Sequence, residues 1–112
     1  MNSVITCILL SLMLFLAPVS LHAEEVVINA VGDIMLAGRW SQTLKKMGYD
    51  FPFGGVLTEL ATGDINLANL ESPIATCGDE CTTKKFRFRA EPDVAHAMHA
   101  AGFNLVSLAN NH

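Results

Sequence analysis

The chain has 112 residues, a formal net charge of −4 at pH 7 and a hydrophobic content of 51%. Its length allows at most one small domain, and the lack of a basic run argues against binding to nucleic acid. The chain is short for a complete α/β enzyme domain and stops directly after Asn-Asn-His, so we expect it to be the N-terminal piece of a longer protein.

The N-terminus carries the features of an export signal. Residues 4–17 form an uncharged apolar run, which is followed by the small residue Ala23 and an acidic pair. This pattern predicts a secretory signal peptide over residues 1–23. No Lys or Arg precedes the apolar run, so a membrane anchor through residues 4–21 stays open as the alternative. Both predict an exported protein that is periplasmic, at the cell surface or extracellular.

Residues 26–36 predict the first β-strand. The run is apolar and rich in β-branched residues, as in a strand that is covered on both faces. Gly32 allows the backbone to turn or to be approached closely, and it precedes the carboxylate of Asp33 near the end of the strand. Arg39 follows shortly afterwards. It is either a surface charge or a contact to an anionic group of the substrate.

The middle of the chain alternates helices with a second strand. A helix is expected through Met47, with Gly48 as its end, and a short helix over residues 56–61. Residues 64–71 predict a strand that ends in Glu71. Asp64 opens this strand and therefore lies far from its tip, because a strand rises about 3.3 Å per residue. We interpret Asp64 as a loop or cap residue.

A polar connection follows the second strand and contains Cys77-Gly-Asp-Glu-Cys81. In an exported chain, two cysteines at this spacing favour a disulfide between Cys77 and Cys81. A metal site would need further Cys or His ligands nearby, and the segment has none.

Residues 86–89, Phe-Arg-Phe-Arg, alternate strictly and predict a short strand. Arg89 then belongs to a solvated basic face or contacts an anionic substrate. Pro92 opens a helix that ends at Gly102. Its apolar stripe consists of Val94, Ala97, Met98 and Ala101.

The last strand is expected over residues 103–112, which end in Asn-Asn-His. Strands that alternate with helices predict the α/β class with a mainly parallel sheet. The carboxyl ends of such strands share one edge, so Asp33, Glu71, Asn111 and His112 are expected to form one polar site. These donors suit Mn, Fe, Mg or Zn, and two such ions can activate water against a phosphoryl group. His112 could protonate a leaving oxygen.

Several motifs together resemble the CapA (PgsA) family of capsule or poly-γ-glutamate biosynthesis proteins. They are Val31-Gly-Asp-Ile-Met-Leu36, the Phe-Pro-Phe-Gly-Gly loop, Asn69-Leu-Glu-Ser-Pro73, Phe88-Arg-Ala90 and the block from Ala101 to His112. The resemblance implies that residues 24–112 are the N-terminal portion of a calcineurin-like metallophosphoesterase α/β/β/α sandwich with a two-metal site. It gives Asp33, Glu71 and Asn111 the role of metal ligands, and His112 that of ligand or general acid.

Two departures separate the chain from the wider phosphoesterase pattern. Met35 stands where that pattern has a His, and Asn-Leu-Glu71 replaces its second motif. The resemblance therefore implies two functional hypotheses. In the first, the protein is a metal-dependent hydrolase that acts with membrane-bound synthesis machinery on an anionic polymer. In the second, it is a non-catalytic polymer-binding or scaffold component of the capsule machinery.

Overall fold

The computed structural model describes residues 23–112, and the predicted signal peptide or anchor lies outside these residues except for Ala23. The elements in chain order are β1 (Ile28–Ile34), η1 (Gly38–Trp40), α2 (Ser41–Met47), η2 (Phe51–Phe53), α3 (Leu57–Leu60), β2 (Ile65–Leu70), α4 (Asp93–Ala101) and β3 (Leu105–Ser107). Within residues 23–112, no helix combines the length and the apolar character needed to cross a membrane.

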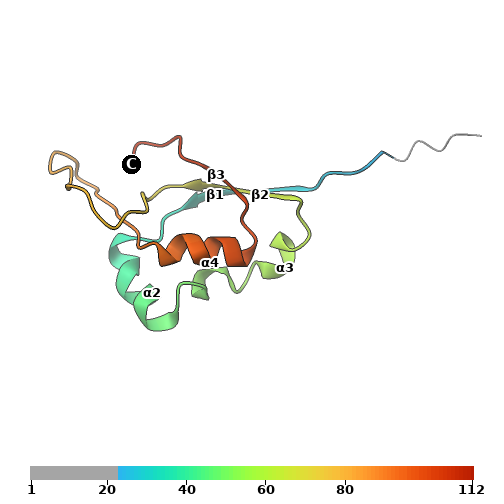
Figure 1. Cartoon of the computed structure of the whole chain (residues 1–112), viewed down its shortest axis with the longest axis horizontal. Coiled ribbons are helices and arrows are strands. Elements are labelled where there is room, and N and C mark those ends of the chain that lie inside the picture. Colours follow the sequence, from blue (N-terminus) through green and yellow to red (C-terminus); the bar gives the residue numbers. More distant parts are fainter. Residues whose placement is uncertain (1–22) are drawn as a thin grey trace, which may run out of the picture.

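The three strands form one parallel sheet in the order β1-β2-β3. This confirms the predicted α/β class and is consistent with the N-terminal part of the sandwich that the resemblance implies. The helices all lie against one face of the sheet, and the end of the chain lies near the long loop that follows β2 (Figure 1). The carboxyl ends of the strands therefore meet at one edge, as the predicted site requires.

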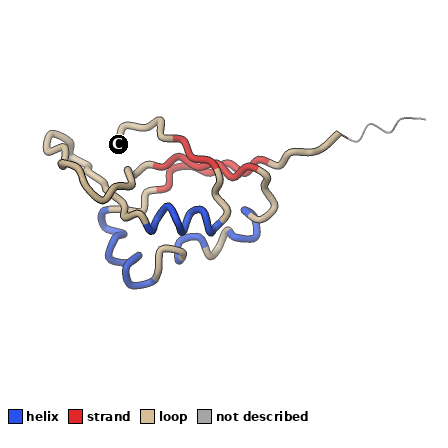
Figure 2. The backbone as a smooth tube through the Cα atoms, viewed as in Figure 1, coloured by secondary structure: helices blue, strands red, loops and turns tan. Residues whose placement is uncertain are grey.

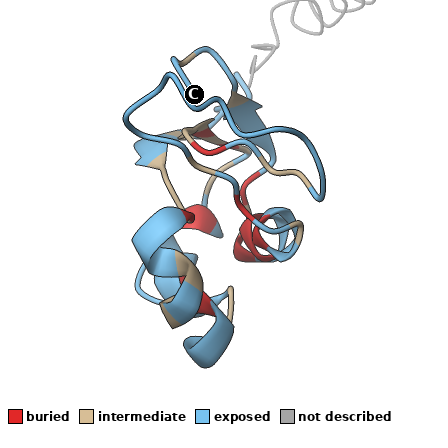
Figure 3. Cartoon of the chain, turned by 90° about the vertical axis from the view of Figure 1, so that its left-hand side faces the viewer, coloured by how far each residue is buried: buried red, intermediate tan, exposed pale blue. Residues whose placement is uncertain are grey.

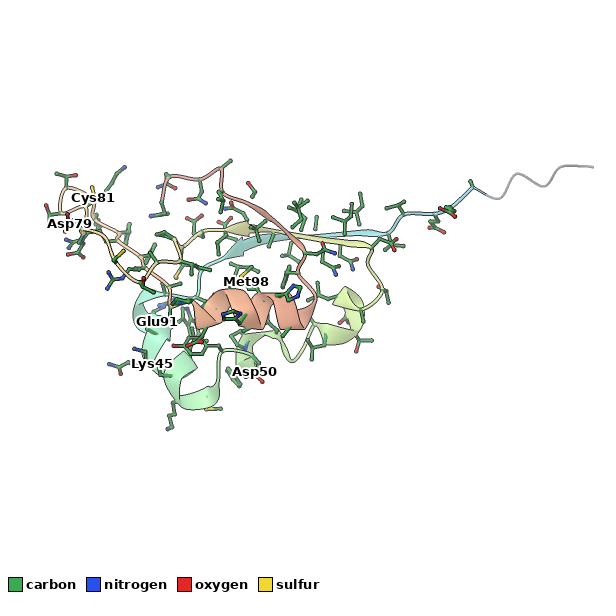
Figure 4. The ribbon with its side chains drawn as sticks, in the orientation of Figure 1. Lys45, Asp50, Asp79, Cys81, Glu91 and Met98 are labelled. Atoms are coloured by element: carbon green, nitrogen blue, oxygen red, sulfur yellow. The ribbon has the colours of Figure 1, made fainter. Side chains whose placement is uncertain are left out.

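Helix α4 makes the crossover from β2 to β3 and forms much of the core. Its buried residues are the four that the apolar stripe predicted, and the residue that ends it, Gly102, has a φ of +109°. A left-handed φ of this kind strongly favours glycine. The buried residues gather where the helices face the sheet (Figure 3), and Met98 projects from α4 toward the strands (Figure 4).

Three predictions about the burial, existence or length of the strands are wrong. Strand β1 is an edge strand whose residues are mostly exposed, because the described helices cover only one face of the sheet. Residues 86–89 form no strand but part of a long loop (Figure 2), and only Ala90 makes an isolated bridge, to Ile74. Strand β3 ends at Ser107, so the final Asn-Asn-His lies in a loop beyond it.

A β-bulge in β1 determines where Asp33 lies. Ala30 pairs with Leu67, but Asp33 pairs with Asn69. Regular pairing from Ala30 would put Asp33 opposite Leu70 instead. The extra residue shifts the register by one position, which moves a side chain to the other face of a strand.

Candidate functional site

Asn69 is the centre of the polar cluster at the carboxyl end of the sheet. Its amide Nδ2 donates hydrogen bonds to Asp33 Oδ1 at 2.8 Å and to Glu71 Oε2 at 3.2 Å. Asn69 and Glu71 are two residues apart, so they lie on the same side of the extended chain. The bulge in β1 brings Asp33 to the same place. One neutral amide thus holds two carboxylates from neighbouring chain segments.

The loop after β3 adds a second amide and an imidazole to this cluster. Asn110 Nδ2 donates to the Leu70 carbonyl at 2.9 Å and to Asn69 Oδ1 at 3.3 Å. Its own Oδ1 accepts a hydrogen bond of 2.9 Å from the backbone N–H of His112. Asn110 therefore ties the end of the chain to β2 and positions His112.

His112 completes the cluster beside Glu71. Its Nε2 lies 3.3 Å from Glu71 Oε1, and the two side chains are only 15% and 18% exposed. On its other side, the imidazole ring packs against the ring of Phe88, with centroids 4.9 Å apart at an angle of 55°. An imidazole held between a carboxylate and an aromatic ring has a restricted orientation, as a proton donor or acceptor needs.

The donor types of the cluster suit a divalent cation, but their placement does not yet form a metal site. Within residues 23–112, no three His, Cys, Asp or Glu side chains gather closely enough to hold one ion. The Asn69 amide lies between the carboxylates of Asp33 and Glu71 and hydrogen bonds to both. The described residues alone therefore do not complete a metal site, although Asp33 and Glu71 supply donor atoms of a suitable type.

Of the other predicted site residues, two line a cavity beside the cluster and one does not. Asn111 and Arg89 line a cavity of about 590 Å³ that His112 also lines. Arg39 does not line this cavity, and its guanidinium lies 5.8 Å from the ring centroid of Trp40. The structure therefore places Arg89 in the wall of the cavity that His112 lines, and Arg39 outside that wall.

The predicted disulfide is not formed. Cys77 and Cys81 are both free and exposed, and Figure 4 shows Cys81 and Asp79 at the far tip of the loop after β2. The Sγ of Cys81 is instead 3.3 Å from Thr83 Oγ1. The hydrogen bond from this hydroxyl is the largest influence that lowers the pKa of the Cys81 thiol below its usual range.

Sequence analysis missed the two asparagines that organise the cluster. Asn69 belongs to the motif Asn69–Pro73 and Asn110 to the final Asn-Asn-His, but neither is among the predicted ligands. The spacing of Asn69 and Glu71 is a signal that could have identified the first, because alternate residues of a strand share a face. Nothing comparable marks Asn110, which lies in a loop.

Comparisons with known proteins agree on one family. The family model described as "Bacterial capsule synthesis protein PGA_cap" matches residues 27–112. The chain is also similar to the capsule biosynthesis protein CapA of Bacillus anthracis, with 28% identity over 92 residues. That alignment covers 80% of this chain and 22% of the relative, so the chain spans about a fifth of its relative's length. No solved structure gives a significant match.

Proposed function

The chain belongs to the family of the bacterial capsule synthesis protein PGA_cap, and from this premise we propose that the whole protein acts on an anionic surface polymer such as poly-γ-glutamate. Its role would be in the synthesis, transfer or tethering of that polymer, together with membrane-bound synthesis machinery. The observation that carries the proposal is the continuous chain of contacts from Asp33 through Asn69 and Glu71 to His112.

The reaction that we propose is hydrolysis of a phosphoester or related bond, with His112 as the general acid. A general acid needs a proton on a ring nitrogen that faces the leaving oxygen. Glu71 Oε1 lies 3.3 Å from His112 Nε2, and Asn110 Oδ1 accepts a hydrogen bond from the backbone N–H of His112, so the position of this ring nitrogen is defined. Binding of a substrate oxygen close to Nε2 would bring it within reach of that proton.

Hydrolysis of bis-p-nitrophenyl phosphate by the whole protein tests this role. We expect His112→Ala to lower kcat/KM by about 100-fold, the usual contribution of a positioned acid. The matched control is His96→Ala, because His96 is exposed on α4 and has no part in the cluster. If His112→Ala and His96→Ala hydrolysed the ester equally fast, His112 would have no catalytic role.

Metal binding by the whole protein is a separate part of the proposal. We expect one or two divalent ions (Mn, Fe, Mg or Zn), with Asp33 and Glu71 among the ligands. Elemental analysis should therefore find less metal in Asp33→Asn and Glu71→Gln than in the controls Asp50→Asn and Glu59→Gln. An unchanged metal content in the first pair of variants would remove these two residues from the ligand set.

The alternative function is a non-catalytic polymer-binding or scaffold module. Met35 favours it, because this side chain is partly buried and packs against the hydrophobic core, where the wider phosphoesterase pattern has a histidine ligand. Ester hydrolysis that is lost in His112→Ala would count against this alternative.

We also propose that the protein is exported, by a signal peptide over residues 1–23 or with an anchor through residues 4–21. N-terminal sequencing of the mature protein distinguishes the two forms. A first residue at Glu24 supports cleavage, an intact N-terminus in the membrane fraction supports the anchor, and an intact protein in the cytoplasm contradicts export.

A further inference from the structure

The cavity beside His112 has a chemically distinctive lining. It measures about 590 Å³, which lies within the range of small-molecule sites. Its walls come from the loop after β2 and from the end of the chain, and they include three cationic and two aromatic side chains: Lys84, Arg87, Arg89, Phe86 and Phe88. His112 belongs both to this cavity and to the polar cluster at the carboxyl end of the sheet, so the cavity and the cluster are continuous.

The cations of this cavity differ in whether they are already paired. Arg87 Nη1 lies 3.3 Å from Glu80 Oε2. Within residues 23–112, neither Lys84 nor Arg89 has a carboxylate within 4.0 Å. The lining also contains the acidic Asp79 and Glu80. The cavity therefore presents two cations without an acidic partner and a third that is held by an internal carboxylate.

The aromatic residues give the cavity a defined shape. The rings of Phe86 and Phe88 are stacked at 6.5 Å and 16°, and Phe88 in turn packs on the imidazole of His112. This row of three rings runs from the exposed end of the cavity to the polar cluster at the carboxyl end of the sheet. The same cavity is therefore lined both by this row of rings and by the side chains of Arg87 and Arg89.

We propose that this cavity binds an anionic group, a phosphate or a carboxylate, of a ligand whose reacting part reaches His112. Arg89 and Lys84 are its contacts, because a guanidinium and an ammonium are the side chains that pair with such groups most strongly. The proposal rests on the proposed function to the extent that His112 is shared. Glu80 acts as an internal competitor, since it occupies Arg87 when no anionic ligand is bound.

The test measures binding of two probes to the whole protein. One probe is a fluorescently labelled ten-residue L-glutamate peptide, and the other is tripolyphosphate, which is measured by calorimetry. We expect Arg89→Glu to weaken the binding of at least one probe by about tenfold or more, as expected for loss of a charge-assisted contact and gain of a repulsive one. The matched control is Lys46→Glu, the same charge reversal on an exposed residue of α2 outside the cavity.

A second variant is expected to change the affinity for the probe in the opposite direction. Glu80→Gln removes the internal competitor of Arg87, so the same probe should bind about two- to threefold more tightly. The probe that responds to these variants identifies the anionic group as phosphate or carboxylate.

Three results would overturn the proposal: no binding of either probe to the wild-type protein, equal affinities of Arg89→Glu and Lys46→Glu, or weaker binding by Glu80→Gln. The outcome is independent of catalysis, because binding is also measurable in His112→Ala. A protein that hydrolyses no ester but binds through Arg89 would disprove only the proposed reaction. A protein that loses ester hydrolysis in His112→Ala but binds without Arg89 would disprove only the anion site.

Discussion

Asparagine side chains organise both ends of the sheet, but the groups to which they donate hydrogen bonds differ. At the amino end, Asn66 is 2% exposed, and its Nδ2 donates to the carbonyls of Leu60 and Gly102, both at 2.8 Å. Asn29 Nδ2 donates to Asn66 Oδ1 at 2.9 Å. At the carboxyl end, Asn69 donates to two carboxylates instead.

The difference lies in the partners of each asparagine. At the amino end they are neutral backbone and amide groups, so the buried side chain of Asn66 is paired through both Oδ1 and Nδ2 and stabilises the fold. At the carboxyl end they are ionisable groups next to a cavity, and Asp33 Oδ2 has no hydrogen-bond partner within residues 23–112. We interpret the first network as structural and the second as the functional site.

The largest expected effect on stability is at the amino end. Asn66→Ala removes the buried amide that donates to the carbonyls of Leu60 and Gly102, so we expect the free energy of unfolding to fall by about 3 kcal/mol. Urea unfolding of the whole protein measures this loss. The matched variant is Asn69→Ala on the same strand, which should lose less than about 1 kcal/mol because its partners remain accessible to water. Equal losses in the two variants would contradict the comparison.

A glycine at the amino end offers an independent test of the same network. A Cβ at Gly63 would overlap Asn66 Oδ1 and Asn29 Nδ2, whereas a Cβ at Gly55 would meet no atom within 4 Å. We expect Gly63→Ala to lower the free energy of unfolding by about 2 kcal/mol, as overpacking usually does, and Gly55→Ala to have little effect. Thermal unfolding of the two variants distinguishes them. A Gly63→Ala protein as stable as Gly55→Ala would show that the asparagine network is loosely packed.

At the carboxyl end, the expected loss is in function. Asn69→Ala removes the donor shared by Asp33 and Glu71, so the two carboxylates repel each other without an intervening amide. We expect kcat/KM for ester hydrolysis to fall about tenfold, which corresponds to about 1.4 kcal/mol of transition-state stabilisation. Asn66→Ala, assayed at a temperature where it is folded, should keep its activity. Loss of activity in both variants alike would mean that the two ends are not separate.

The smallest expected effect is on the thiol of Cys81 at the tip of the loop. Because the Thr83 hydroxyl lowers the pKa of this thiol, Thr83→Ala should raise that pKa and reduce the fraction of thiolate at a given pH. The rate of alkylation by iodoacetamide, measured against pH in a background with Cys7→Ser and Cys77→Ser, should therefore rise at higher pH than in the parent. A midpoint that stays the same or moves to lower pH would exclude the Thr83 hydrogen bond as the cause.

The parts of the fold that follow a strong periodicity were predictable from the sequence. The buried stripe of α4 and its end at Gly102 agree with the structure, because helical spacing and a left-handed glycine are local signals. The parallel order of the strands followed from their alternation with helices. The predicted strand over residues 86–89 was wrong. Strict alternation arises equally in an extended loop, and pairing with a neighbouring strand cannot be predicted from one segment alone.

The candidate site was predictable only in outline. Asp33 and Glu71 lie together at the carboxyl ends of β1 and β2, as the parallel sheet requires, and the loop after β3 brings His112 to the same edge. The bulge that gives Asp33 its partner depends on pairing with β2, so nothing within β1 reveals it. The role of Asn110 likewise depends on a loop that folds back on Leu70. Such tertiary hydrogen bonds leave no periodic trace in the sequence.

The most direct test of the central claim compares two glutamates in living cells. A strain that lacks the whole protein is complemented with Glu71→Gln or with Glu59→Gln, an exposed control on α3, and capsule polymer is measured at matched protein levels. If the carboxyl end of the sheet is the functional site, Glu59→Gln restores the capsule and Glu71→Gln does not. Equal capsule in both strains would contradict the account.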